Sequence, residues 1–263
     1  MNIIIGDIGN TVTKICLVNV KNYKVIKIIY LNSKKINSYS YLKKNLKNTI
    51  QNKKINKFAL FSSVVPKYQK ILTFFFYKSS KIKLIEIKSN KINKIVKINF
   101  KNKKQVGSDR IANAVGVYKK YKSNCIVLDF GTATTFDIIT KNGLYNGGII
   151  APGINLSIKS LSIFADQIPL FSLRKPKVVI GKNTIEALRS GFYWGYSGLI
   201  NNIISKIENK TKKKYKIILT GGYASLFKST ISRSFTVDKN VTINGIIEIF
   251  KINKKLFKLN EKK

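Results

Sequence analysis

Two short motifs each place an aspartate two residues before a glycine and follow that glycine with threonine. They are DIGNT at 7–11 and DFGTAT at 129–134. Glycine permits a tight turn whose backbone N–H groups face an anion, and threonine adds a hydroxyl donor. The aspartate cannot bind phosphate itself, but it can hold a cation or an ordered water that does. The pair predicts a site that binds a polyphosphate from two sides, whereas one copy alone is equally typical of an ordinary hairpin turn.

The distribution of acidic residues supports this interpretation. The chain has 50 Lys+Arg and only 11 Asp+Glu, so acids that served only to balance charge would be scattered among the lysines. Four aspartates lie instead in segments rich in glycine, serine and threonine, or beside an arginine: Asp7, Asp109, Asp129 and Asp137. We expect these four to serve a site, with Asp137 bracing the second motif from the returning strand.

The segment GSDRIANAVG at 107–116 carries the candidate for acid–base chemistry. Ser108 is expected to cap a helix over 109–121, which places Asp109 and Arg110 in the first turn. The positive end of the helix dipole favours an ionised carboxylate there, so Asp109 should stay ionised and accept a proton. Arg110 can bind a carboxylate or a phosphate with two N–H groups. The alternative is a helix cap with a local ion pair.

Three further glycine-containing segments have weaker functional signals. TGG at 220–222 follows an apolar run and would let a flat ring or a phosphate approach closely. GGIIAPG at 147–153 is typical of a loop that lines a cleft, or of a plain turn. Gly191, Gly195, Gly198 and Asn202 recur at helical spacing, which predicts a helix face that another helix can approach, in the same chain or across a dimer.

The elements that position these residues follow from apolar periodicity. We expect strands at 2–6, 12–20, 24–31, 57–62, 82–87, 124–130, 134–140 and 215–220, and helices at 109–121, 154–164, 184–208 and 245–255. The lysine-rich and asparagine-rich stretches 32–57 and 88–105 should hold helices and surface loops. Because the order strand, aspartate–glycine motif, strand occurs twice, the chain is expected to contain two related α/β lobes that meet near 115–123.

Composition excludes several classes of site and protein. The chain has no histidine, and its two cysteines, Cys16 and Cys125, lie far apart in apolar runs. This excludes a conventional zinc site, a histidine-containing triad and a disulfide framework, and it favours buried cysteines in a reducing, cytoplasmic compartment. The net charge of +39 is nearly all lysine, so we interpret it as a solvated surface and do not expect nucleic acid as a partner. We expect no signal peptide and no membrane span.

DIGNTVTK, GSDR, DFGTATTFD, GGIIAPG, GKNT and TGG, in this order and at these intervals, closely resemble type III pantothenate kinase. That family belongs to the superfamily of acetate kinases, sugar kinases, heat-shock ATPases and actin. The resemblance implies an α/β fold of two related actin-like (ribonuclease H-like) lobes with a nucleotide cleft between them. The N-terminal lobe, 1–118, would carry the first phosphate loop. The C-terminal lobe, 119–263, would carry the second loop and the adenosine-side TGG motif.

The resemblance also implies a reaction, ATP-dependent phosphorylation of pantothenate to 4′-phosphopantothenate, the first step of coenzyme A biosynthesis. ATP would act with Mg²⁺ and with a monovalent cation, K⁺ or NH₄⁺, held by Asp129, and Asp109 would be the catalytic base. ATP would contact Asp7, Ile8, Gly9, Asn10, Thr11, Val12, Thr13, Lys14 and Thr132. Pantothenate would contact Phe100, Gly107, Ser108, Asp109, Arg110 and Thr184. A homodimer is implied as well.

One position departs from the family pattern. The family usually has a tyrosine seven residues before the glycine of its GxDR motif, and this chain has Phe100 there. Loss of a hydroxyl whose partner stays unpaired costs about 1–3 kcal/mol. Two alternatives to pantothenate kinase remain at this point. One is a non-catalytic, kinase-like regulatory protein that acts as a transcriptional accessory factor. The other is a kinase of the same fold that acts on a different alcohol.

Overall fold

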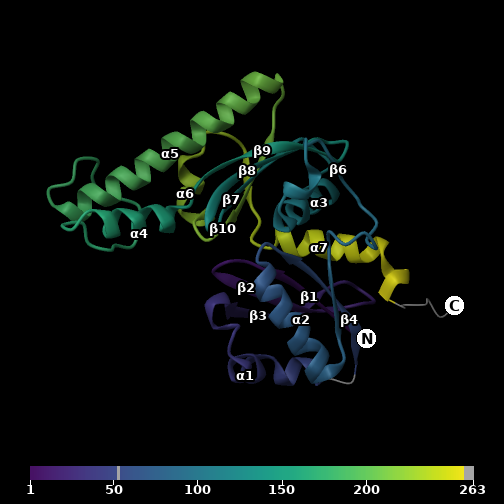
Figure 1. Cartoon of the computed structure of the whole chain (residues 1–263). Helices are drawn as coiled ribbons and strands as arrows, with labels where there is room; N and C mark the ends of the chain where they lie inside the picture. The colour runs from purple at the N-terminus through teal and green to yellow at the C-terminus, as the bar shows by residue number, and fades with distance from the viewer. Residues whose placement is uncertain (52–53, 258–263) are drawn as a thin grey trace. The chain divides into compact units, whose positions relative to one another are not determined.

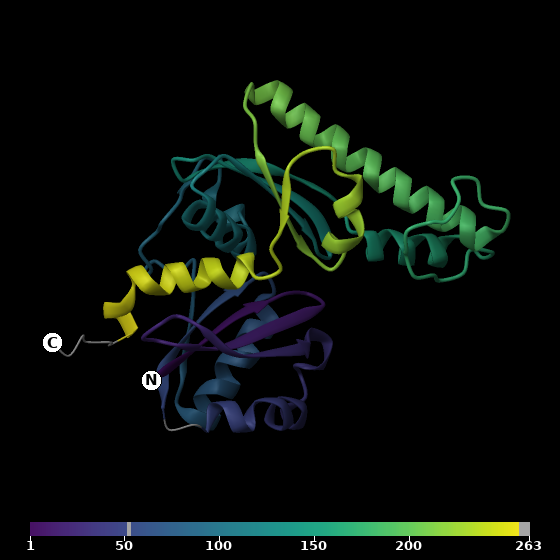
Figure 2. The ribbon, with the colours of Figure 1, turned by 180° about the vertical axis from the view of Figure 1, so that it is seen from behind.

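A computed structural model describes residues 1–51 and 54–257 of the chain (Figure 1; Figure 2). The chain divides into two compact units. The first comprises Met1–Lys120 together with the segment that starts at Asn240, and the second comprises Tyr121–Lys239. The sequence places one boundary near residue 118, and the units also divide close to that position. They differ from the expected lobes in the C-terminal segment, which is grouped with the first unit because its helix packs against the strands there.

The first unit is built on a five-stranded sheet with the order β3-β2-β1-β4-β5. Antiparallel pairing joins β3 to β2 and β2 to β1, whereas β4 and β5 continue the sheet in parallel. Apolar β-branched runs form these strands, as expected from the sequence, and the central strands β1, β2 and β4 are buried along most of their length. The strands are β1 (Asn2–Ile8), β2 (Val12–Asn19), β3 (Val25–Asn32), β4 (Ile55–Ser63) and β5 (Lys83–Glu86).

The second unit repeats this design. Its strands follow the order β9-β8-β7-β10-β11, with β9, β8 and β7 antiparallel and β10 and β11 parallel to β7. Each unit therefore begins with an antiparallel meander and continues with parallel strands, so the expectation of two related α/β lobes is confirmed. The strands are β7 (Cys125–Phe130), β8 (Ala133–Ile139), β9 (Leu144–Pro152), β10 (Lys216–Gly221) and β11 (Phe235–Val237).

Helices cover both faces of the first sheet. Alternate residues of β1 point to opposite faces, so Ile4 packs in one core with α1 and α2, whereas Ile3 and Ile5 face the side where α7 contacts β1. Figure 1 shows α1 and α2 beside one another. The elements are α1 (Tyr39–Ile50), α2 (Pro66–Ser80), α3 (Ser108–Tyr121) and α7 (Val241–Ile252), with short pieces β6 (Lys97–Ile98), η1 (Ser33–Lys35), η2 (Lys103–Gln105) and η4 (Lys254–Phe257).

The two helices α3 and α7 approach closely at a pair of glycines. A Cβ added at Gly245 would lie 1.8 Å from the carbonyl oxygen of Ala112. A Cβ added at Gly116 would lie 2.4 Å from the carbonyl oxygen of Val241. Backbone therefore packs directly against backbone, which only glycine permits. This contact places α3, the helix that carries the GSDR motif, within the first unit.

In the second unit, the long helix α5 packs its apolar face on the sheet. Its buried residues Tyr193, Ile200 and Ile204 belong to the same core as Phe136 of β8 and Leu219 of β10. The helices of this unit are α4 (Ile154–Phe164), α5 (Thr184–Thr211), α6 (Ala224–Phe227) and the 3-10 turn η3 (Lys228–Thr230).

One sequence interpretation of the fold needs correction, and one helix was not anticipated. GGIIAPG is not a loop: all of it except Gly153 lies in β9, paired with β8, because backbone pairing outweighs the low strand preference of its glycines. The segment after Ser63 had no assignment from the sequence, and it forms α2, which starts with Pro66 at its first position.

Cys16 and Cys125 are free and buried, as expected. Across the described residues, no helix is both long and apolar enough to cross a bilayer.

Candidate active site

The first aspartate–glycine motif forms the hairpin turn between β1 and β2. The Gly9 N–H donates to the Val12 carbonyl at 3.2 Å, which closes the turn, and Asn10 and Thr11 are exposed at its tip. Two of the expected ATP contacts, Ile8 and Thr13, have fully buried side chains. Neither residue is accessible to a nucleotide in this structure, and the Thr13 hydroxyl bonds to the Ser33 hydroxyl at 2.9 Å.

The other expected ATP contacts lie around this turn. Asp7 is half-buried near the end of β1, directly opposite Lys14 in the antiparallel register. Val12 begins β2 and is exposed, and the Lys14 ammonium lies 5.6 Å from the ring centre of Tyr30. The turn therefore offers exposed backbone, a threonine hydroxyl and a lysine within a few residues. These are groups that bind phosphate.

The end of β4 connects this turn to the GSDR segment. The Val64 N–H donates to the carbonyl of Ile8 at 3.1 Å. One residue earlier, the carbonyl oxygen of Ser63 lies 3.0 Å from the Ser108 hydroxyl oxygen, within hydrogen-bond distance. Two segments about 100 residues apart in sequence are thus fixed to adjacent residues of one strand end. The structure brings the first phosphate turn and the candidate base into the same part of the first unit.

Ser108 has a different role from the one expected. It is the first residue of α3 and not the cap before it, and its buried hydroxyl points to β4 and β5. The carboxylate of Asp109 lies at the helix start instead, where Oδ1 accepts the Arg110 N–H at 2.7 Å. Gly107 leaves room for this carboxylate, because a Cβ added there would lie 2.6 Å from Oδ1 of Asp109.

Burial raises the pKa of the Asp109 carboxyl above its ordinary value, and it does so against opposing effects. The Arg110 N–H, the Arg110 charge and the Lys88 charge all lower that pKa. From the sequence, only the effect of the helix end could be considered, and this effect keeps the Asp109 carboxyl ionised. The structure adds burial, which makes the ionised carboxylate a stronger base than an exposed aspartate. A raised pKa suits a residue that must accept a proton.

This pKa shift predicts a pH-dependent stability difference. A raised native pKa means that the folded protein binds more protons than the unfolded chain at pH values between 3.8, the ordinary pKa of aspartate, and the raised pKa. The free energy of unfolding therefore falls as pH rises through this window. Asp109→Asn removes this contribution and should be more stable than the parent protein at neutral pH. The difference in melting temperature between Asp109→Asn and the parent protein should narrow as pH falls toward 4. A gap that stays constant with pH would contradict the burial effect.

The second motif forms the turn between β7 and β8, and two other glycine segments meet it. The Gly131 N–H donates to the Ala133 carbonyl at 3.1 Å, and the Gly222 N–H of TGG donates to the Phe130 carbonyl at 3.0 Å. A Cβ added at Gly153, the last residue of GGIIAPG, would collide with the Thr132 backbone. The second unit therefore gathers all three glycine segments around one exposed turn.

The two aspartates of the second motif have different surroundings. Asp129 is half-buried in β7, next to the turn. A carboxylate beside exposed backbone and the Thr132 hydroxyl supplies only oxygen donors, which fits a hard cation such as K⁺. Among residues 1–51 and 54–257 there is no cluster of three or more acidic, cysteine or histidine side chains for a multidentate metal site. Asp137 is fully buried on β8, and its Oδ1 accepts from the Tyr145 hydroxyl at 2.8 Å.

The remaining predicted substrate contacts lie apart from these turns in sequence. Thr184 is exposed and begins α5, just after Asn183, whose side chain accepts the Glu186 N–H and caps the helix. Phe100 is half-buried in the segment between β6 and η2, in the first unit with Asp109.

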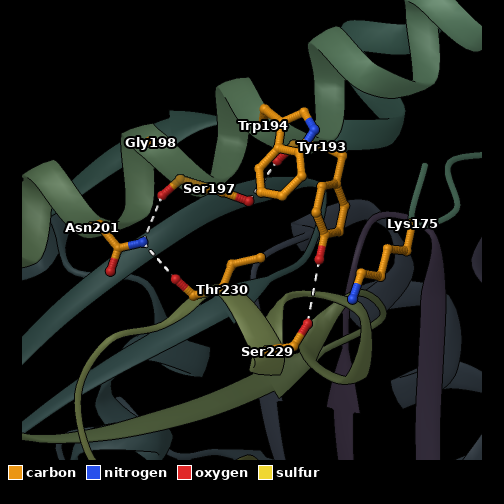
Figure 3. A pocket seen from close by; sticks show the side chains of 8 residues that line it. All are labelled: Lys175, Tyr193, Trp194, Ser197, Gly198, Asn201, Ser229 and Thr230. Carbon is orange, nitrogen blue, oxygen red and sulfur yellow. Dashed lines mark hydrogen bonds between the residues drawn. The ribbon is translucent and has the colours of Figure 1, made fainter. Parts of the chain in front are cut away.

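A cavity of about 520 Å³ lies between α5 and η3 in the second unit (Figure 3). None of the predicted site residues lines it. Hydrogen bonds cross it: the Tyr193 hydroxyl meets the Ser229 hydroxyl at 3.3 Å, and Asn201 Nδ2 donates to the Thr230 carbonyl at 2.8 Å. These contacts brace η3 against α5, which is a structural role.

Sequence reasoning missed Glu86 and Lys88, which contact the GSDR segment from the end of β5. Glu86 Oε1 accepts the Ser108 hydroxyl at 2.5 Å. Lys88 Nζ donates to the carbonyl of Val106 at 2.9 Å. The scarcity of acids could have drawn attention to Glu86, as it did to the aspartates, but no motif surrounds it.

With this geometry established, comparison with known proteins identifies the family. The type III pantothenate kinase family model matches residues 3–206. A type III pantothenate kinase of Pelagibacter ubique is 53% identical over 245 residues, which cover 93% of this chain and 97% of that protein.

Two solved structures share the fold at low sequence identity. One is described as a Baf family transcriptional activator from Campylobacter jejuni, with a TM-score of 0.61, 22% identity and coverage of 96% of this chain and 100% of that chain. The other is MreB 5 of Spiroplasma citri bound to AMPPNP, with a TM-score of 0.54, 13% identity and coverage of 98% of each chain. Both support the expected actin-like α/β fold and carry no functional argument. On the family match and the identity over nearly the whole chain, this protein belongs to the type III pantothenate kinase family.

Proposed function

We propose that this protein is a phosphotransferase that uses ATP to phosphorylate pantothenate, the first step of coenzyme A biosynthesis. Family membership supports the reaction. One structural observation supports the assignment of the base: the Asp109 carboxyl is half-buried at the start of a helix, and the end of β4 connects that helix to the first phosphate turn. The regulatory alternative has no support from the functional residues, because both turns and the GSDR segment are intact.

Asp109 is the proposed proton acceptor. The primary hydroxyl oxygen of pantothenate forms a bond to the γ-phosphorus while the bond from that phosphorus to the ADP oxygen breaks, and the hydroxyl proton passes to the Asp109 carboxylate. Gly107, Ser108 and Arg110, with Phe100 and Thr184, are proposed to hold pantothenate. Positioning of the hydroxyl against the carboxylate and the phosphorus supplies much of the rate acceleration.

The two turns are proposed to bind the nucleotide. In the first, Gly9 would shape the turn while Asn10 and Thr11 would donate to phosphate oxygens, and in the second Thr132 would do so. Mg²⁺ would neutralise charge on the phosphates, and a monovalent cation, K⁺ or NH₄⁺, would bind at Asp129. The exposed residues at the tips of both turns, Asn10 and Thr11 in the first and Gly131 and Thr132 in the second, fit this role.

A coupled assay of ATP consumption, with and without pantothenate, tests the proposal. With Mg²⁺ and K⁺ present, pantothenate should raise ATP consumption well above the background. Replacing K⁺ by Na⁺ or a bulky organic cation should lower turnover, and Asp129→Asn should remove that dependence. If another alcohol but not pantothenate stimulates consumption, the substrate assignment is wrong. Specific DNA binding at physiological salt without turnover would favour the regulatory alternative.

We also propose a cytoplasmic homodimer that uses the exposed face of α5. A Cβ added at Gly191, Gly195 or Gly198 would meet nothing within 4 Å, so this face is open to another helix. The same unit exposes Ile163 and Phe164, with 70% and 88% of their surfaces accessible. Exposed apolar side chains of this size are typical of interfaces.

Light scattering after size exclusion tests the dimer. The wild type should have twice the 29.8 kDa mass of one chain. Gly195→Arg should lower the measured mass to that of a single chain. Asn209→Arg, on an exposed site of the same helix, is the matched control and should leave the mass unchanged. A wild-type protein that stays monomeric at micromolar concentration would exclude this interface.

A further inference from the structure

Glu86 is the last residue of β5, and both of its carboxyl oxygens are engaged. Oε2 accepts the Lys88 N–H at 2.6 Å, and Oε1 accepts the Ser108 hydroxyl at 2.5 Å. Glutamate is rarely buried unless it is paired or hydrogen-bonded. This one is half-buried in a chain with few acids. Its two bonds connect the end of a strand to the first residue of α3.

Ser108 connects Glu86 to the candidate base, Asp109. The serine is 2% exposed, and its oxygen lies within hydrogen-bond distance of both the Glu86 carboxylate and the Ser63 carbonyl. Because Ser108 immediately precedes Asp109 in the first turn of α3, fixing the serine side chain fixes the backbone from which the aspartate side chain extends. The direction of the Asp109 carboxylate therefore depends on an acid 23 residues away in the sequence.

Lys88 holds the other side of the same segment. Its ammonium donates to the carbonyls of Lys104 and Val106, at 2.8 and 2.9 Å. Val106 directly precedes Gly107, whose missing side chain makes room for the Asp109 carboxylate. Glu86 and Lys88, two residues apart, thus fix the GSDR segment before and after its glycine.

Burial raises the pKa of the Glu86 carboxyl, while the Ser108 bond and Lys88 lower it. The carboxyl therefore depends on these partners to stay ionised.

We infer that Glu86 is a positioning residue, which holds the Asp109 carboxylate in line with the reacting hydroxyl through Ser108. The inference rests on the proposed function, since it assigns Asp109 as the base. Glutamine at position 86 has a single acceptor oxygen, so it cannot accept both the Ser108 hydroxyl and the Lys88 N–H as the two carboxylate oxygens do, and its NH2 group can only donate to Ser108. A misplacement of the base by a fraction of an ångström to about 1 Å lowers turnover by about 10-fold to 100-fold.

A double-mutant cycle on turnover tests this role. Glu86→Gln and Ser108→Ala are each made in the wild type and in Asp109→Asn, and pantothenate phosphorylation is measured at saturating substrates by mass spectrometry. In the wild type, each should lower kcat by about 10-fold or more while the KM for ATP changes less than about twofold. In Asp109→Asn, where the base is gone, each should lower the residual rate by less than about twofold.

Glu248→Gln is the matched control, because it removes an acid of the same unit that pairs with Lys251 away from this network. It should leave kcat unchanged. If Glu86→Gln does not fold, Ser108→Ala carries the same comparison. Equal losses in the wild type and in Asp109→Asn would show a merely structural role, and an unchanged kcat would overturn the inference. If the wild type itself does not phosphorylate pantothenate, the proposed function fails, and that result is distinct from either outcome.

Discussion

Replacing Asp109 by asparagine is expected to lower pantothenate turnover by about 10²-fold to 10⁴-fold, the usual contribution of a general base. Asparagine keeps an acceptor oxygen for the Arg110 N–H, so the helix start should persist. It cannot take a proton. ATP binding should change by less than about twofold, because the nucleotide contacts are proposed on the two turns. Steady-state kinetics and calorimetric titration with ATP measure the two effects separately.

The matched control is Asp166→Asn, which changes an exposed aspartate outside the proposed site. It should retain full turnover. Turnover of Asp109→Asn within a few-fold of the wild type would show that another group accepts the proton. Loss of ATP binding together with turnover would instead indicate a general disruption of the first unit.

Gly245→Ala is expected to cause the largest loss of stability among single methyl additions. The new Cβ would lie 1.8 Å from the Ala112 carbonyl oxygen and 3.0 Å from the Gly116 nitrogen, so α7 and α3 must move apart. Overpacking of this kind costs about 1–3 kcal/mol or more, because neither contact atom is the end of a flexible side chain. Because α3 carries Asp109, a shift of α3 should lower turnover as well.

Urea denaturation measures this cost as a shift of the unfolding midpoint. Asn244→Ala, the neighbouring position on the same helix, is the control, and it should change stability by no more than about 0.5 kcal/mol. A Gly245→Ala protein as stable as that control would contradict the close backbone contact between the two helices.

Much of the fold could be predicted because its signals are local. Aspartate, glycine and threonine between two apolar runs describe a tight turn wherever they occur, and both DIGNT and DFGTAT form such turns. The repetition of this pattern indicated two related units, and the matching strand orders of the two sheets confirm them. The helix over 154–164 ends where its apolar spacing ends.

The errors arose where tertiary contacts outweigh local preference. Glycine and proline argue against a strand, yet GGIIAPG is paired along β8. Serine before an apolar helix usually caps it, but Ser108 finds the Ser63 carbonyl and Glu86 in the folded protein. Pro66 begins a helix whose Phe75 and Phe76 are buried, and a run of aromatic residues does not distinguish a helix from a strand.

The candidate site shows the same division. The turn residues and Asp109 could be named from the sequence because motifs surround them. Glu86 and Lys88 could not, since their role depends on the distance between the end of β5 and the start of α3 after folding. The rise in the Asp109 pKa also required the structure, because it comes from burial of the carboxyl in the folded protein.

The most direct test of the account is to identify the product. The purified protein is incubated with ATP, Mg²⁺, K⁺ and an equal mixture of pantothenate and a second primary alcohol of similar size, and the products are separated and weighed by mass spectrometry. The account predicts 4′-phosphopantothenate as the main product with the wild type and almost none with Asp109→Asn. Phosphorylation of the second alcohol in preference to pantothenate, or equal product from both proteins, would contradict it.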